Sequence, residues 1–413
     1  MATMPRRLAL LMIAWLAWVP ALFAQGQGTA PAGFRGMPGP VPGQELYQRQ
    51  MLNAQLVPSR PAPFYDETPL DVAIGNVFSE SWLRVEYLNY RLTEPGSRPI
   101  GAEPVTAATV PLFQATDRGG AARPGILART TSLERTNYEN NNGLRLSFGL
   151  PTEQFTFEGS FWGFAEKQNR VDHEVLFNSD ITLLFPGPVI PVIPLNPITT
   201  TTGQLQDFIN FDGGMRSTLT TALYGTEANF VFPPITPNVA MEVSPIVGFG
   251  YMNFRNEFEI EGADQQTATF HQIDSITNNN IFGPQLGLRM EAKGKWLTLG
   301  VEPKFLFGIN RNHSEVSTAQ IYTDTELPFL TQDETTRFTP TVDLGAFARI
   351  HLRPNFSVTM GYDFMAMNGI SLADRQIVWD STRQPTDPPA ITMDTARHTF
   401  VIHGFNVGMD WRF

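Results

Sequence analysis

The sequence has no cysteine at all and few charged residues for its length. Of its 413 residues none is Cys, and 17% are Asp, Glu, Lys or Arg. The absence of thiols excludes a disulfide framework and every thiolate metal site. Glycine (34) and proline (33) are abundant instead. This composition favours many turns over a helical protein.

Long apolar runs are also lacking, except at the N-terminus. Arg6 and Arg7 precede the apolar run Leu8–Phe23, and Ala24 offers a small residue for cleavage. This is the pattern of a signal peptide over residues 1–24. An uncleaved membrane anchor is the alternative, because the run approaches spanning length. No later stretch holds 18 apolar residues, so the sequence predicts no further transmembrane helix.

Residues 25–79 are rich in Pro, Gly and Gln and show no sustained period of 3.6 or 2. We therefore expect a flexible segment. From residue 80 to the end the dominant signal is period two, the alternation of a strand with one apolar and one polar face. In the last segment the apolar face holds Val401, Phe405, Val407, Met409, Trp411 and Phe413. The polar face holds Gly404, Asn406, Gly408, Asp410 and Arg412.

Ten segments of this kind predict ten strands. They cover approximately residues 80–92, 143–150, 155–165, 216–232, 239–251, 282–291, 297–307, 341–351, 356–366 and 401–413. Four connections between them are short, at 151–154, 233–237, 293–295 and 353–354. Five are long, at 93–142, 166–215, 255–280, 309–337 and 369–397. Short and long connections alternate along the whole chain.

This alternation predicts an all-β fold, a transmembrane antiparallel β-barrel of about ten strands over residues 80–413. Outer-membrane barrels have an even strand number, short periplasmic turns and long external loops. Both chain ends, and the segment 25–79, would then lie in the periplasm. Twelve strands are the alternative if 93–142 hides a hairpin such as 126–136. A soluble β-sandwich also alternates apolar and polar residues, but it does not require this order of loops.

Bilayer chemistry explains the distribution of side chains. Lipid offers no hydrogen bonds, so outward residues must be apolar, while inward ones can be charged. Tyr87, Tyr251, Tyr362 and Trp411 lie on the apolar face toward strand ends, as an aromatic girdle requires. The candidate lumen-lining residues are Arg84, Glu86, Arg145, Glu158, Glu227, Glu242, Arg289, Glu291, Glu302, Lys304, Asp343, Arg349, Asp363, Asp410 and Arg412.

Two functions follow from this lumen. Rings of charge tune ion selectivity in pores, which favours passage of small solutes or ions. Alternatively the charges pair with each other and close the barrel, because eight strands leave room only for side chains and 16–18 leave a true channel. A closed barrel would act as a structural anchor or as a surface-binding protein.

The long connections carry most of the net charge. Together they amount to −12 with His neutral, and the chain without Arg6 and Arg7 to −13. This distribution argues against nucleic acid, whose binding needs a basic footprint. A solvated acidic surface and a dedicated cation site are the two readings. The proline-rich stretch Phe185–Ile198 is predicted to fold inward as a constriction or to dock a partner as polyproline II.

An enzyme is the third class. His173 lies between Asp172 and Glu174, and His271 lies near Asp274. Neither has the spacing of a known metal or nucleophile motif, so we predict no catalytic residue, no metal and no cofactor.

Five stretches carry a resemblance to a known family. They are Trp82–Leu88, Gly248–Tyr251, Asn280–Gly287, Gly361–Phe364 and Gly404–Gly408. With them the chain, over residues 80–413, resembles the seventh putative β-barrel porin family. The resemblance implies a barrel in the bacterial outer membrane, with lipid as its surroundings, and names no solute. In similar proteins a terminal aromatic such as Phe413 is recognised by the barrel-assembly machinery.

Overall fold

A computed structural model gives the fold of the C-terminal part of the chain. It describes residues 81–93, 95–101, 112–116, 122–129, 131–136, 141–175, 197–202, 205–236, 241–265, 268–321, 328–379 and 391–413. The predicted signal peptide and the segment 25–79 lie outside these residues. Within them, no helix is long and apolar enough to cross a membrane.

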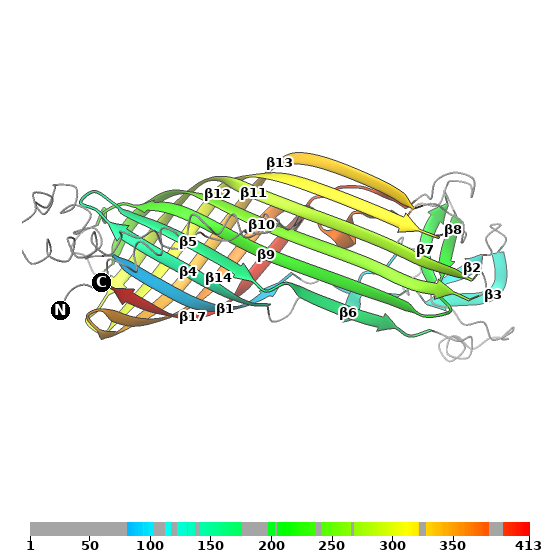
Figure 1. Cartoon of the computed structure of the whole chain (residues 1–413), viewed down its shortest axis with the longest axis horizontal. Helices are drawn as coiled ribbons and strands as arrows, with labels where there is room; N and C mark the ends of the chain where they lie inside the picture. The colour runs from blue at the N-terminus through cyan, green and yellow to red at the C-terminus, as the bar shows by residue number, and fades with distance from the viewer. Residues whose placement is uncertain are drawn as a thin grey trace, which may run out of the picture. The chain divides into compact units, whose positions relative to one another are not determined.

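Ten of the eleven strands of a single antiparallel sheet form the barrel (Figure 1). They are β1 (Trp82–Leu92), β4 (Asn141–Pro151), β5 (Thr156–Phe164), β9 (Met215–Val231), β10 (Glu242–Asp264), β11 (Thr269–Lys293), β12 (Leu297–Ala319), β13 (Phe329–Arg353), β14 (Phe356–Ile370) and β17 (His398–Arg412). Each predicted strand segment coincides with one of them, so the prediction of ten strands is confirmed. The segment predicted from Val239 begins at Glu242, and Val239 itself lies outside the described residues.

The sheet closes on itself. Its order is β10-β11-β12-β13-β14-β17-β1-β4-β5-β9, and β9 pairs again with β10. The first and last strands lie side by side, with Trp82 opposite Arg412. Strand β6 (Lys167–His173) pairs with β9 at residues that β5 does not reach. The described strands thus form a closed antiparallel barrel.

Smaller elements come from the connections. Strands β2 (Leu112–Thr116) and β3 (Ala122–Arg129) pair only with each other, so the alternative of twelve barrel strands is wrong. The other small elements are β7 (Pro197–Thr202) with β8 (Leu205–Asn210), β15 (Ile377–Trp379) with β16 (Ile391–Met393), and the 3-10 turns η1 (Leu133–Arg135) and η2 (Ala373–Arg375).

The predicted loops 255–280 and 309–337 are wrong. Strands β10 and β11 run for 23 and 25 residues and are joined by 265–268 alone. Strands β12 and β13 run for 23 and 25 residues and are joined by 320–328. A tilted membrane strand needs about 9–11 residues. A large part of each strand therefore lies beyond the bilayer, in a sheet that continues past the ends of β1, β14 and β17 (Figure 1). We call this part of β9–β13 the extension.

One row of outward side chains marks where the membrane ends. Tyr251, Phe282, Ile309 and Phe338 stand directly opposite one another on β10, β11, β12 and β13. Two residues further along each strand the outward row is Asn253, Asn280, Arg311 and Thr336. The change from apolar to polar occurs at the same level on four strands, as a bilayer surface requires.

The apolar face changes sides at this boundary. On the membrane part of β10 the apolar residues point outward, as Val247 and Phe249 do, with exposed fractions of 43% and 50%. Beyond Tyr251 the inward residues Phe254 and Phe258 are apolar and buried, while the outward residues are polar, with charges from Arg255 onward. Period two continues, but its phase inverts, because lipid surrounds one part of the strand and water the other.

Candidate functional site

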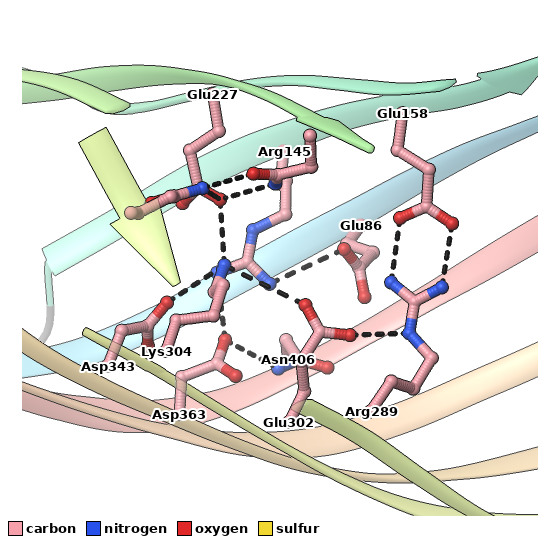
Figure 2. A network of polar contacts seen from close by, with 12 residues as sticks. Glu86, Arg145, Glu158, Glu227, Arg289, Glu302, Lys304, Asp343, Asp363 and Asn406 are labelled. Atoms are coloured by element: carbon pink, nitrogen blue, oxygen red, sulfur yellow. Dashed lines mark hydrogen bonds and ion pairs between the residues drawn. The ribbon is translucent and has the colours of Figure 1, made fainter. Parts of the chain in front are cut away.

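Eleven of the fifteen predicted lumen residues line one cavity of about 100 Å³ inside the barrel, partly open to solvent. We call them the charged layer: Arg84, Glu86, Arg145, Glu158, Glu227, Arg289, Glu302, Lys304, Asp343, Arg349 and Asp363. Alternation places these side chains inward on adjacent strands, and strand pairing brings them to a common level. Figure 2 shows most of them converging.

Lys304 lies at the centre of three carboxylates. Its Nζ is 2.7 Å from Glu227, 3.0 Å from Asp343 and 3.8 Å from Glu302 (Figure 2). Lys304 is on β12 and Glu227 on β9, so this ion pair skips two strands of the barrel and crosses its interior. The Lys304 side chain is only 13% exposed.

Arg289 makes a second crossing. Its two terminal nitrogens donate to the two oxygens of Glu158 at 2.6 and 2.7 Å, and its Nε donates to Glu302 at 2.7 Å (Figure 2). A bidentate guanidinium–carboxylate pair fixes orientation as well as distance. Glu302 therefore links Arg289 to Lys304.

Arg145 makes the third crossing, from β4 to β14. It donates to Asp363 at 2.8 Å and lies 3.5 Å from Glu86. Asp363 also accepts hydrogen bonds from the Tyr90 hydroxyl and from the Asn406 amide. These neutral partners were not among the predicted residues. Period two could place them inside the barrel, but it could not tell which charge each would contact.

The remaining predicted residues lie closer to the short turns. Glu291, Asp410 and Arg412 line a second cavity of about 300 Å³. Arg84, Glu158, Arg289 and Arg349 line both cavities. We call the second one the turn-side cavity. Arg84 donates to Asp410 at 3.0 Å. Glu242 lines neither cavity and pairs instead with Lys293 at 2.6 Å.

Above the charged layer the barrel is filled with apolar side chains. Phe254 on β10 and Phe400 on β17 are both buried, and their ring centroids lie 4.7 Å apart. Four strands separate β10 from β17 in either direction around the barrel. Two side chains from opposite walls thus meet in the middle of the lumen.

A segment of the β14–β17 connection folds against the inner wall. We call residues 371–376 the plug. Asn279 accepts the backbone N–H of Ser371 at 3.1 Å and donates to its carbonyl at 2.9 Å. Asn256 accepts the N–H of Ala373 at 3.0 Å, and Ser275 donates to the carbonyl of the same residue at 2.6 Å.

Three further contacts complete the attachment of the plug. The Gln376 amide donates to Ser275 and to the carbonyls of Ile276 and Glu315, at 2.8–3.0 Å. Arg98, from the first connection, pairs with the buried Asp374 at 2.5 Å.

The sequence did not single out the plug. It predicted an inward fold for Phe185–Ile198, of which residues 185–196 lie outside the described part, while Pro197 and Ile198 belong to β7. It also predicted the whole of 369–397 as an external loop. Residues 371–376 of this connection do not project from the barrel but pack against the inner face of the extension. A possible signal was the run of inward Asn, Ser and Thr on β11, which needs polar partners.

The two histidines considered as candidate catalytic or metal-binding residues each form a hydrogen bond with a neighbouring strand or turn. His173 Nε2 is 2.8 Å from the Ser217 hydroxyl, and burial lowers the His173 pKa to about 4. His271 is fully buried, with Nδ1 2.6 Å from the Gln320 carbonyl. Among the described residues no group of three or more His, Asp or Glu could hold a metal ion.

Solved structures similar to the chain include several outer-membrane proteins. The outer membrane protease OmpT from Escherichia coli is 7% identical with a TM-score of 0.41, and the match covers 81% of this chain and 97% of that one. The attachment invasion locus protein Ail of Yersinia pestis is 10% identical with a TM-score of 0.22, covering 81% and 98%. The Ralstonia pickettii toluene transporter TbuX is 7% identical with a TM-score of 0.23, covering 82% and 91%.

These scores are too low for any inference about activity. None of the curated proteins matches the sequence. The family description "Putative beta barrel porin-7" does match, over residues 82–413, which is the whole closed barrel and its connections. The resemblance noted in the sequence is thereby confirmed, and the chain belongs to the putative beta barrel porin-7 family.

Proposed function

We propose that the protein is an outer-membrane barrel that is closed in its ground state and that anchors the extension at the cell surface. The contact between Phe254 and Phe400, from opposite walls, carries this proposal. The two rings belong to a cluster of buried apolar side chains that fills the lumen at that level.

The state of the charged layer supports the same function. Every carboxylate of the layer has a cationic partner within 4.0 Å among the described residues. Mutually paired charges bind each other in place of permeating ions. Ten strands also lie near the narrow end of barrel sizes, where side chains fill the interior.

Location and orientation are part of the proposal. The short turns and both ends of the barrel domain would face the periplasm, and the extension would face the outside. Residues 1–24 would direct export. Phe413, whose side chain is 50% exposed, would be the signal for the barrel-assembly machinery. We propose no catalytic role.

Planar-bilayer recording tests the closed state. Folded protein, identified by a heat-dependent shift on a detergent gel, should give conductance near zero over many insertions. Stable, stepwise conductance from the unaltered protein would overturn the proposal.

A second function, the passage of small solutes or ions through a lumen that opens, is favoured by one observation. The outer half of the lumen is closed partly by the plug, which belongs to a connection, and the inner half contains the two cavities. Replacing 371–376 with a Gly/Ser linker in a Phe254→Ala, Phe400→Ala background should then produce conductance. The Phe254→Ala, Phe400→Ala protein with its plug intact is the control, and no conductance in either would exclude this function.

A further inference from the structure

The turn-side cavity is more basic than the charged layer above it. Five cationic residues line it against three carboxylates: Arg84, Arg289, Lys293, Arg349 and Arg412 against Glu158, Glu291 and Asp410. In the charged layer five cations face six carboxylates. The excess positive charge therefore lies at the end of the lumen that is near the short turns.

Arg349 is the residue in this cavity with the poorest partners. It is 9% exposed, and it lines both cavities. Its two ion pairs are long, 3.6 Å to Asp410 and 3.8 Å to Glu291. No described residue accepts a hydrogen bond from it, and its buried Nε has no hydrogen-bond partner, since Asp410 lies 3.6 Å away.

Asp410 and Glu291 each form a shorter ion pair with another cation, Arg84 at 3.0 Å and Lys293 at 3.5 Å. Asp410 accepts two hydrogen bonds from Arg84, at 3.0 and 3.2 Å. A guanidinium has five N–H donors in a rigid fork, and a buried donor left without an acceptor costs about 1–3 kcal/mol. Arg349 thus has donors to spare at the cavity wall.

Thr359 and Arg412 also have side-chain hydrogen-bond donors without an acceptor among the described residues. The Thr359 hydroxyl, on the residue paired with Arg349 across β13 and β14, is buried with no partner among the described residues. The side chain of Arg412, at the end of β17, makes no ion pair or hydrogen bond with a described residue and is exposed at the cavity. Arg349 and Arg412, from β13 and β17, thus bring spare donors to a cavity that contains excess positive charge.

We propose that the turn-side cavity binds a small oxyanion of the phosphate or carboxylate class, held by Arg349 and Arg412. The planar guanidinium matches two oxygens of such an anion, and burial strengthens the interaction relative to water. Arg84 and Arg289, which already bind carboxylates, contribute charge and set the shape of the site. The site goes beyond the closed-barrel function and does not depend on whether the lumen conducts.

Calorimetric titration of folded barrel with inorganic phosphate tests the site, with acetate as a second probe. We expect saturable binding, weakened about tenfold or more by Arg349→Gln and by Arg412→Gln, since a charge-assisted hydrogen bond to an anion accounts for at least that factor. Arg255→Gln, on the outer face of the extension, removes the same charge away from the cavity and should leave binding unchanged.

Three outcomes overturn the inference. The first is no saturable binding of either anion, which would mean that the groups around Arg349 are only hydrated. The second is binding that both lumen variants leave unchanged. The third is binding that Arg255→Gln weakens as much as they do. Arg412→Gln lies at an exposed strand end and tests the site even if Arg349→Gln does not fold.

Discussion

At the scale of the residue, the charged layer depends on a single lysine. Lys304 is the nearest cation to both Glu227 and Asp343 and also lies within reach of Glu302. Removing one partner of a buried pair leaves an uncompensated charge, which costs about 3–5 kcal/mol. Lys304→Met should therefore lower the free energy of unfolding by about that amount, measured by urea titration of the barrel in lipid vesicles.

Lys293→Met is the matched control for this variant. Lys293 also pairs with two glutamates, Glu242 and Glu291, but its side chain is 53% exposed. Exposed pairs contribute about 0–1 kcal/mol. Equal losses in the two variants would mean that the charged layer is solvated and would argue for an open lumen.

A second residue-scale prediction concerns pH. Asp274 lies on the outer face of β11, directly opposite Glu259 of β10. Burial raises the Asp274 pKa to about 6 from its ordinary 3.8, and the negative charges of Glu259 and Glu257 add to the rise against the hydrogen bonds from Gln272 and Ser317.

Because the folded state holds this proton more tightly than the unfolded state, the free energy of unfolding should fall as pH rises from about 4 to about 6. Amide hydrogen exchange in β10 and β11, corrected for the intrinsic rate, should accelerate over that window. Asp274→Asn should remove the acceleration, whereas Glu334→Gln, a surface carboxylate on β13, should retain it. Identical pH profiles for wild-type protein and Asp274→Asn would contradict the prediction.

At the scale of the element, the plug is held by side chains of the wall, and the Asn279 amide contacts both backbone polar groups of Ser371. It donates to the Ser371 carbonyl and accepts from the Ser371 N–H. Asn279→Leu leaves both groups buried without partners, a cost of about 1–3 kcal/mol each. Hydrogen exchange at 371–376 should then increase by one to a few orders of magnitude, about tenfold per 1.4 kcal/mol.

Asn278→Leu gives the control on the same strand. Asn278 is the preceding residue, points outward, and accepts a hydrogen bond from Asn253. It should leave exchange in the plug unchanged. Protection of 371–376 that survives Asn279→Leu would mean that the Arg98–Asp374 pair and Gln376 hold the plug without it.

The elements also show what the sequence could predict. All ten membrane strands were predictable because lipid forces one face to be apolar over the full width of the bilayer. The extension was mistaken for loops because the search was for a constant apolar face. On β10 this face moves from Phe249 outside to Phe254 inside, so a fixed phase ends at Tyr251. An inversion of phase on two neighbouring segments was the signal that could have revealed it.

The ion pairs of the lumen could not be predicted from the sequence, for a different reason. The inward face of each strand followed from alternation, but the pairs join strands that are three places apart around the barrel, as Arg289 and Glu158 do. Which levels coincide depends on the stagger of all strands between them. Glu242 faces the same side as Glu227 in the pattern, yet it pairs at the rim with Lys293.

At the scale of the whole molecule, the barrel has two ends of different construction. At one end, connections such as 294–296 and 354–355 follow directly on the membrane strands. At the other, β10–β13 continue for about ten residues or more as a sheet with polar residues outside and apolar residues inside. Among the described residues, only those of the second end form a core of their own outside the membrane, so this end can present a folded surface to the medium.

The absence of cysteine makes this asymmetry directly testable, because a single introduced thiol is the only one that a maleimide can label. Glu334, in the extension, has a side chain that is 60% exposed, and Asn355 is exposed in the turn that follows the same strand. A membrane-impermeant maleimide should label Glu334→Cys on intact cells. It should label Asn355→Cys only after the outer membrane is broken, because short turns face the periplasm. Thr341→Cys, buried between the two on β13, should stay unlabelled until the barrel is unfolded. The reverse order of labelling for Glu334→Cys and Asn355→Cys would place the extension in the periplasm and remove its role at the cell surface.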